Sequence, residues 1–274
     1  FLEHSGFRGV PGRHALERND YLAGTDDQRS SDLNAMLRDP GIRAIVFARG
    51  GYGLMRILES IDYDAITADP KILLGMSDVT ALQLSLSRTC NLVTLAGPML
   101  VGQVAAGLDP ISEEWLIKAL VEPIGDKNLW PGEELGTRVL RPGKASGVLI
   151  GGCLSLITAL LGTDHSPDFR GKILLVEDVG EPLYRIDRML TQLKLSGVLA
   201  DIAGLVLGHF VGPDQTDLAE DVERMALQFT WDNPVPVISR YPHGHRLPNL
   251  TLPIGVTVAM DVQSHMLRVG DLPA

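Results

Sequence analysis

The sequence is poor in cysteine, in aromatic residues and in concentrated positive charge. Its two cysteines, Cys90 and Cys153, lie far apart and outside any CxxC pattern, so neither a disulfide framework nor a thiolate zinc site is indicated. We expect both to be buried free thiols. Lys and Arg number 24 against 34 Asp and Glu, which gives a formal net charge of -10, and no run of basic residues forms a stripe. This balance disfavours nucleic acid as a partner, because nucleic-acid binding depends on phosphate neutralisation.

The sequence also lacks the pattern of a secretory signal. The opening residues FLEHSGFRGVPGRH have no basic start, apolar core or small-residue cleavage site, so we expect a cytoplasmic protein. One uncharged stretch, 145–163, approaches the length of a membrane span. The glycine pair Gly151 and Gly152 divides it into a strand-like GVLI and a helix-like CLSLITALLG, each too short to span a membrane alone. We expect a buried strand followed by a buried helix, and no membrane partner.

Hydropathy in the first half of the chain alternates between strand-like and helix-like segments. Short apolar runs over 42–48, 71–75 and 92–97 are separated by segments with helical spacing. This order is typical of a parallel sheet that helices cover on both faces. The second half also mixes the two kinds of segment, and its tail over 251–270 has the alternation and turn residues of an antiparallel hairpin.

A Pro/Gly-rich, charged stretch over 122–136 indicates a linker between these halves. We therefore predict an α/β protein with two lobes and a cleft between them. The expected divisions are an N-terminal α/β domain with a parallel sheet over 1–125, a linker over 126–136, and a smaller mixed α+β domain over 137–274.

The segment LLGMSDVTAL contains the sharpest local feature of the sequence. Ser77 stands there between an apolar strand and a helix whose first turn contains Asp78. Such a turn exposes a hydroxyl near the free backbone N–H groups of a helix N-terminus, which suits a nucleophile. It is not the GxSxG elbow, because Val79 stands where the second glycine would be. The alternative is that Ser77 or Asp78 only caps the helix.

A serine nucleophile needs a base, and the histidine pair in YPHGHRLPN offers one. The HxH spacing of His243 and His245 places both imidazoles on one face of an extended segment, so a metal site is the competing interpretation. No Asp, Glu or Cys stands close to the pair in sequence. The Gly/Pro-rich setting favours a loop that holds one histidine in a cleft.

A carboxylate that orients the base must come from the end of a buried strand. The segment KILLVEDVGEP ends its apolar run with Glu177 and Asp178. Asp178 has a structural alternative, which is an ion pair with Arg185 or Arg188.

The segment ARGGYG over 48–53 follows a strand and opens a helix, so its adjacent glycines form a turn that favours anions. It lacks both GxGxxG and GK[ST], and therefore predicts neither a dinucleotide site nor a phosphate loop. Two uses remain open: a backbone N–H for an oxyanion hole, or a tight turn that simply requires glycine.

Six of these segments together resemble the LD-carboxypeptidase family of serine peptidases, which also contains the microcin-type self-immunity peptidases. They occur in the family's order and cover nearly the whole chain. The segments are ARGGYG with its following helix, LLGMSDVTAL, LAGPML, GGCLSLITALLGT, LLVEDVGEPLYRIDRML and HGHRLPNLTLPIG.

The resemblance implies a catalytic triad in which Ser77 is the nucleophile, Glu177 the orienting acid and His245 the base. It also implies an oxyanion hole made by the backbone N–H groups of Gly51 and Asp78, with no metal and no cofactor. The expected reaction is hydrolysis of the amide to a terminal D-amino acid of cytoplasmic murein tetrapeptides during peptidoglycan recycling.

The family resemblance further implies that the serine lies in the N-terminal lobe, that the acid and base lie in the C-terminal lobe, and that the protein is a homodimer. Arg49, beside the expected oxyanion hole, is a candidate for attracting the substrate carboxylate, with a structural ion pair as the alternative. A microcin-type immunity peptidase and a non-catalytic α/β binding protein are the two alternative functions.

Two features depart from the family pattern. Cys153 stands where the family's GGN has asparagine, so we expect a polar contact near the cleft to be lost. The chain also begins at what resembles the end of the family's first helix, so we expect the opening strand and its small-residue loop to be missing.

Overall fold

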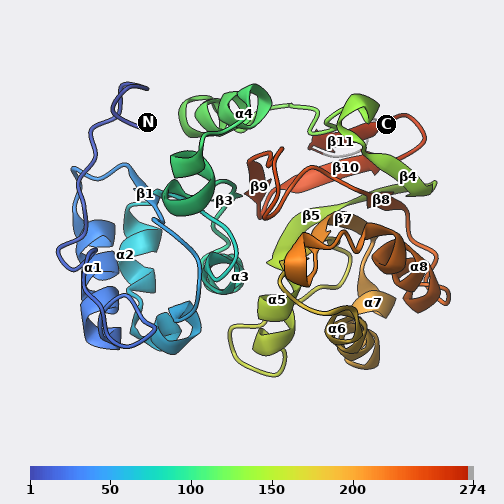
Figure 1. Ribbon diagram of the computed structural model, residues 1–274, viewed down its shortest axis with the longest axis horizontal. Coiled ribbons are helices and arrows are strands. Elements are labelled where there is room, and N and C mark those ends of the chain that lie inside the picture. The colour runs from blue at the N-terminus through green and yellow to red at the C-terminus, as the bar shows by residue number, and fades with distance from the viewer. Residues whose placement is uncertain (271–274) are drawn as a thin grey trace.

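The computed structural model describes residues 1–270 of the chain and contains two β-sheets. A four-stranded sheet has the order β1-β2-β3-β9, and a seven-stranded sheet has the order β11-β10-β5-β6-β7-β8-β4. The first sheet and its helices form an N-terminal lobe, and the second sheet and its helices form a C-terminal lobe (Figure 1). The predicted two-lobed α/β fold is confirmed.

The N-terminal lobe follows the predicted alternation of strands and helices. Its first three strands pair in parallel, at β1 with β2 and β2 with β3. Their short apolar sequences fit a sheet with buried faces. The elements are α1 (Asp26–Arg38), β1 (Ala44–Val46), the 3₁₀ helix η1 (Leu54–Ser60), α2 (Tyr63–Ala68), β2 (Ile72–Gly75), α3 (Val79–Thr89) and β3 (Thr94–Ala96).

The fourth strand of this sheet comes from the far end of the chain. Strand β9 (Leu252–Ile254) pairs antiparallel with β3. The prediction that 251–270 is one hairpin is therefore wrong for its first residues. The rest is confirmed, because β10 (Thr257–Asp261) and β11 (Met266–Val269) pair antiparallel. A three-residue apolar strand gives no local sign of the sheet that it joins.

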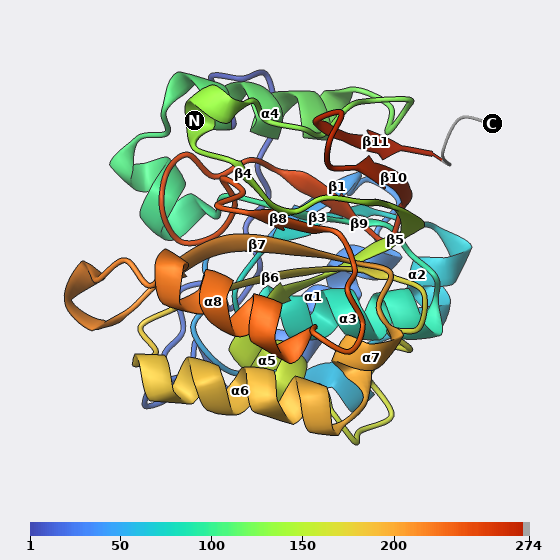
Figure 2. The ribbon, with the colours of Figure 1, turned by 90° about the vertical axis from the view of Figure 1, so that its right-hand side faces the viewer.

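The C-terminal lobe contains a parallel core of β5, β6, β7 and β8, extended by antiparallel strands on both sides. Figure 2 shows α5 to α8 on one side of this sheet. The elements of this lobe are β4 (Arg138–Arg141), β5 (Lys144–Cys153), α5 (Leu154–Leu160), β6 (Ile173–Val179), α6 (Leu183–Leu195), α7 (Val198–Asp201), β7 (Gly204–Val211), α8 (Ala219–Phe229) and β8 (Val237–Ser239). Helix α4 (Pro110–Val121) packs instead on the sheet of the N-terminal lobe, where its Leu116 forms a buried apolar cluster with Leu74 and Leu95.

Helix α3 joins the two lobes. Its residues 79–86 are all buried, and it packs against α5 and β5 of the C-terminal lobe (Figure 1). One cluster of buried apolar side chains accordingly runs through both lobes, from Leu37 of α1 through Leu82 of α3 to Leu154 of α5. The lobes share a hydrophobic core and are not separate bodies on a flexible linker.

The uncharged stretch 145–163 forms a strand and a helix, as predicted, but the boundary is not at the glycine pair. Strand β5 runs through Gly151 and Gly152 to Cys153. A Cβ atom on Gly151 would lie 1.9 Å from the Leu175 carbonyl oxygen of the neighbouring strand, so glycine is required there for close strand pairing. Among residues 1–270, no helix is both long and apolar enough to cross a membrane.

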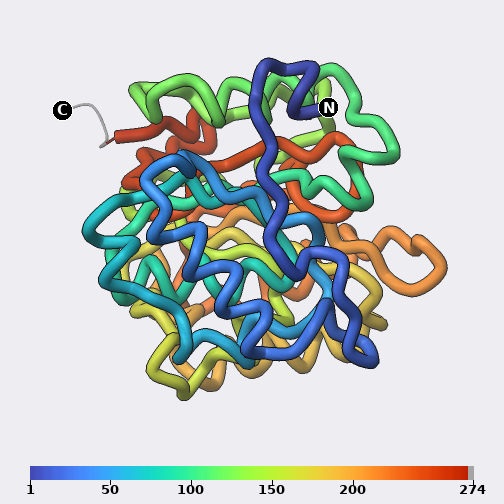
Figure 3. Tube along the Cα trace, turned by 90° about the vertical axis from the view of Figure 1, so that its left-hand side faces the viewer, coloured from blue at the N-terminus to red at the C-terminus, as the bar shows by residue number. Residues whose placement is uncertain are grey.

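Helix α1 was not predicted, although the sequence TDDQ carries a signal for it. The Thr25 hydroxyl accepts from the Gln28 N–H at 3.2 Å, and the Gln28 side chain accepts from the Thr25 N–H at 2.8 Å, which is a capping box. The chain before α1 runs over the outside of the N-terminal lobe (Figure 3). The Asp32 side chain holds this segment against α1, because its carboxylate accepts a hydrogen bond from the backbone N–H of His14 at 2.7 Å.

Candidate active site

Ser77 lies in the turn between β2 and α3, with a φ angle of +64°. Positive φ is uncommon for a residue other than glycine, and such strain clusters at functional sites. The neighbours Met76 and Asp78 are buried, whereas Ser77 is only partly buried. The turn therefore presents Ser77 alone of these three residues toward solvent.

Asp78 does not cap the helix with its side chain, so that alternative is wrong for Asp78. Its carboxylate turns back and accepts from the backbone N–H of Leu54 at 2.9 Å. Burial raises the pKa of Asp78, and hydrogen bonds from the backbone of Leu54 and Gly53 oppose that rise. The Asp78 side chain thus holds the end of the glycine loop against the serine turn.

The glycine loop lies directly against Ser77. A Cβ atom on Gly50 would lie 2.7 Å from the Ser77 Cβ and 2.9 Å from its Oγ, so only glycine allows this approach. The next residue, Gly51, has a φ of +96°, which also favours glycine. The sequence singled out Gly51 and missed the closer contact of Gly50, although the GG pair itself was the signal.

Glu177 and His245, which the sequence analysis predicts as orienting acid and base, lie in hydrogen-bond contact. Glu177 is near the end of β6, and its side chain is 1% exposed; the His245 side chain, on the loop after β8, is 19% exposed. The His245 Nδ1 lies 2.7 Å from the Glu177 Oε2. Burial lowers the pKa of His245, but the charge and hydrogen bond of Glu177 raise it more, and the pKa is raised overall.

This hydrogen bond fixes the chemistry of the imidazole. With Nδ1–H donated to a carboxylate, Nε2 carries the lone pair that accepts a proton. No hydrogen bond between Ser77 and His245 is present within residues 1–270. Serine–histidine hydrogen bonds in ligand-free enzymes are often long and tighten when substrate binds.

His243 has a structural environment. It is buried, and its Nδ1 lies 2.9 Å from the Leu250 carbonyl oxygen. Burial lowers its pKa. Its own carbonyl accepts from the His209 N–H at 2.8 Å, which ties the histidine loop to β7. In the described part of the chain, no group of three or more His, Cys, Asp and Glu side chains is arranged to hold a metal ion.

Asp178 forms no ion pair with Arg185 or Arg188 in the part of the chain that the structure describes, so that structural alternative is wrong. Arg185 pairs instead with Glu181 at 3.2 Å, and the Arg188 guanidinium lies over the Tyr184 ring at 5.5 Å.

Asp178 accepts from the backbone N–H groups of Ser155 and Val179, both at 2.8 Å. Burial, and then the charge of Glu177, raise its pKa to about 6.

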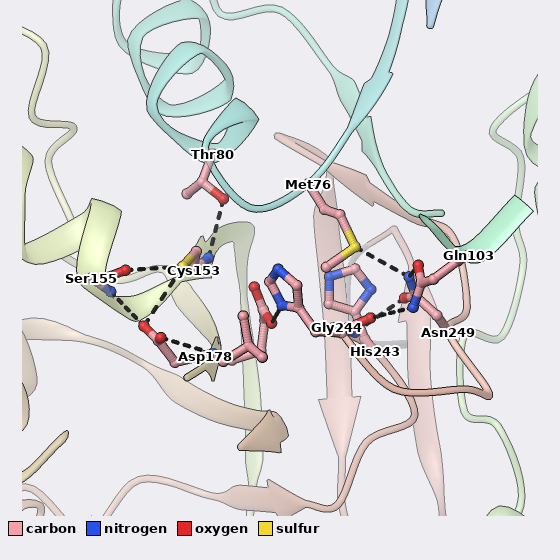
Figure 4. Close-up of polar contacts among 12 residues, drawn as sticks. Met76, Thr80, Gln103, Cys153, Ser155, Asp178, His243, Gly244 and Asn249 are labelled. Carbon is pink, nitrogen blue, oxygen red and sulfur yellow. Dashed lines mark hydrogen bonds and ion pairs between the residues drawn. The ribbon is translucent and has the colours of Figure 1, made fainter. Parts of the chain in front are cut away.

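The thiol of Cys153 lies 3.6 Å from the Asp178 Oδ2 (Figure 4). Burial and the two carboxylates raise the pKa of the Cys153 thiol well above its usual range, which argues against a thiolate nucleophile. Both cysteines are free, but Cys90 is only partly buried, contrary to prediction.

Arg49 is exposed and borders the glycine loop. A Cβ atom on Gly51 would lie 3.9 Å from the Arg49 Nε. The predicted alternative, a structural ion pair, is absent within residues 1–270. The guanidinium is therefore available to an anion at this end of the site.

Two buried or half-buried amides beside the site, Asn249 and Gln103, were not singled out from the sequence. Figure 4 shows them next to Met76 and Gly244. Asn249 stands between Pro248 and Leu250, and this setting was a sequence signal for a buried hydrogen-bonded amide, because a polar side chain among apolar residues must find hydrogen-bond partners.

A strained serine in one lobe and a carboxylate–histidine pair in the other are the parts of a serine hydrolase site. Comparison with known proteins gives the family. Residues 1–97 match the LD-carboxypeptidase N-terminal domain, and residues 146–260 match the LD-carboxypeptidase C-terminal domain. The chain belongs to the LD-carboxypeptidase family, and it is a hydrolase of the carboxypeptidase kind.

Individual relatives agree with this assignment. The "probable murein peptide carboxypeptidase" of Bacillus subtilis is 38% identical over 265 residues, which are 95% of this chain and 82% of that protein. The structure of muramoyltetrapeptide carboxypeptidase from Oxalobacter formigenes has a TM-score of 0.83 at 28% identity, covering 99% of this chain and 93% of that one. The microcin C7 self-immunity protein MccF has a TM-score of 0.87 at 28% identity, covering 99% and 89%.

Proposed function

We propose that this protein is a serine-type LD-carboxypeptidase that hydrolyses the amide to the terminal D-amino acid of murein tetrapeptides. The observation that carries the proposal is the 2.7 Å contact between buried Glu177 and His245, placed in a chain that is 38% identical to a protein named for murein peptide cleavage. Such a pair orients a base for a serine nucleophile.

In the proposed reaction, the Ser77 Oγ attacks the carbonyl carbon while the His245 Nε2 takes the hydroxyl proton. The backbone N–H groups of Gly51 and Asp78 stabilise the negative charge on the tetrahedral oxygen. His245 then protonates the leaving amine, and the D-amino acid departs. Water, deprotonated by His245, hydrolyses the acyl-enzyme and restores Ser77.

Arg49 is proposed to attract the carboxylate of the terminal residue. Its exposed guanidinium borders Gly51 and has no ion-pair partner within residues 1–270. We further propose a cytoplasmic homodimer acting in peptidoglycan recycling, with an N-terminal domain over 1–125 and a C-terminal domain over 137–274.

The first test measures release of D-Ala and L-Ala from otherwise identical murein tetrapeptides at limiting substrate. We expect kcat/KM for D-Ala to be a hundredfold or more greater. Inverting the leaving residue exchanges its carboxylate and methyl group, so the substrate carboxylate is enclosed in the complex without its cation, and an unpaired enclosed charge costs several kcal/mol. Ser77→Ala should lower turnover by roughly 10⁴ to 10⁶.

Other outcomes of this test are informative. Equal kcat/KM values for the two peptides would reject the LD specificity but not the triad. A wild-type rate in Ser77→Ala would reject the nucleophile. If neither amino acid is released, the next substrate to test is an aminoacyl sulfamoyl nucleoside such as the glutamyl sulfamoyl guanosine bound to MccF, and hydrolysis of that compound would favour the immunity function. Binding without turnover of either compound would favour a non-catalytic protein.

A further inference from the structure

Asn249 is a buried amide whose side-chain polar atoms all have partners. Its Oδ1 accepts from the Gly244 N–H at 3.1 Å. Its Nδ2 donates to the Gln103 Oε1 at 2.7 Å and contacts the Met76 sulfur at 3.2 Å. Its backbone N–H donates to the Ser112 hydroxyl at 2.8 Å. Figure 4 shows Asn249 between Met76, Gln103 and Gly244.

Gln103 completes a bridge across the histidine loop. Its Nε2 donates to the Gly244 carbonyl at 3.0 Å. The N–H and C=O of Gly244 are therefore both held by side-chain amides, and the amides hold each other. We call Asn249, Gln103 and Gly244 the amide bridge.

The amide bridge includes the residue before one proposed catalytic residue and contacts the residue before the other. Gly244 immediately precedes His245, and Met76 immediately precedes Ser77. These neighbours belong to different lobes, and no hydrogen bond joins Ser77 to His245 directly in residues 1–270. The relative placement of the nucleophile and the base must therefore come from the packing around them.

Gly244 also has little room to move. Its φ is +126°, and a Cβ atom there would lie 2.7 Å from the Glu177 Oε2. The backbone at Gly244 thus passes against the carboxylate that holds His245. Any shift of Gly244 away from Asn249 and Gln103 moves the adjacent imidazole of His245 relative to Ser77.

We propose that Asn249 is a positioning residue that sets the distance between the Ser77 Oγ and the His245 Nε2. The proposal rests on the function proposed above. Removal of the amide leaves the Gly244 N–H and the Gln103 Oε1 without their partner, and a loop so released relaxes. A misplacement of about 1 Å costs about a hundredfold in rate.

The test compares Asn249→Ala with Asn233→Ala, a matched loss of a side-chain amide outside the bridge. Asn233 donates to the carbonyls of Leu199 and Ile202, both at 3.1 Å, at the end of α7. We expect Asn249→Ala to lower kcat about a hundredfold with little change in KM, because Asn249 acts through the loop and not on substrate. Asn233→Ala should leave both constants near wild type, even where it lowers the melting temperature.

A second measurement separates this proposal from the proposed substrate. The rate at which a fluorophosphonate labels Ser77 depends on the placement of the base and needs no murein peptide. We expect Asn249→Ala to slow labelling by a similar factor, with the acid limb of its pH dependence unmoved, since the Glu177–His245 contact remains. Failure of wild-type protein to release D-Ala, with labelling intact, would reject the substrate and leave the positioning role testable.

Gln103→Met provides a further variant, because Gln103 is only half-buried and its loss is easier to tolerate than that of Asn249. It removes both hydrogen bonds of the Gln103 side chain and should slow labelling in the same direction. Wild-type labelling and kcat in folded Asn249→Ala and Gln103→Met would overturn the proposal, as would a raised KM at unchanged kcat. An equal rate loss in Asn233→Ala would also overturn it, because the effect would then be one of general stability.

Discussion

At the scale of single residues, the site is built from side chains whose neighbours allow them little freedom. Ser77 is held at positive φ with Gly50 against its hydroxyl. Glu177 is buried with its Oε2 on His245, and its Oε1 has no partner among the described residues. Strain and an unsatisfied carboxylate oxygen both cost stability. Their presence together is typical of a site selected for chemistry.

The Glu177–His245 contact predicts a specific pH dependence. In the proposed mechanism His245 accepts a proton and must be neutral to do so, so kcat/KM should fall as pH drops through its pKa, which lies above the usual value. Glu177→Gln removes the charge that raises this pKa and leaves burial, which lowers it. The acid limb should therefore move to lower pH.

The same substitution should lower kcat by roughly 10⁴, because an amide no longer selects the productive tautomer. The measurement is the pH profile of D-Ala release for both proteins. An acid limb that does not move would assign that ionisation to another group. A near-wild-type rate would remove Glu177 from the mechanism.

At the scale of elements, the apolar strands and the strand–turn–helix at Ser77 were predictable because their signals are local. The partners of Asp78 and Asp178 were not, because both carboxylates bind backbone N–H groups of other segments. The same holds for β9, which joins the other lobe's sheet, and for Asn249, whose partners are distant in sequence. Sequence periodicity records which face is buried and not which segment buries it.

The pairing of β5 with β6 predicts that Gly151 tolerates no side chain. Gly151→Ala would place a Cβ 1.9 Å from the Leu175 carbonyl at a φ of +132°. Backbone cannot yield there without breaking the strand pair, so we expect a loss of unfolding free energy greater than about 3 kcal/mol. Urea denaturation measures this loss.

Gly162→Ala is the control for conformational strain alone. Gly162 has a φ of +83° but nothing within 4 Å of a Cβ atom, so its loss should be only about 1 kcal/mol. Equal effects at the two positions would show that strand contact at Gly151 is unimportant.

At the scale of the whole molecule, the shared core makes the two lobes depend on each other. The apolar cluster that passes through α3 joins Leu37 in the N-terminal lobe to Ile186 in the C-terminal lobe. Ser77 lies in the turn that leads into α3, and Glu177 lies on the sheet that α3 packs beside. The active site therefore keeps its geometry only while the lobes remain packed together.

This shared core predicts that the protein unfolds as one unit. Leu82 is 1% exposed in α3, and Leu82→Ala should lower the unfolding free energy by about 2 to 5 kcal/mol through the cavity that it leaves. The substitution should lower the unfolding free energy of both lobes by the same amount. Hydrogen exchange of β2 amides reports the N-terminal lobe, and exchange of β6 amides reports the C-terminal lobe. In wild type and Leu82→Ala, both sets should exchange through the same opening free energy. If β2 amides in the variant exchange at a lower free energy than β6 amides, the lobes are independent units and the core between them does not couple the serine to its base.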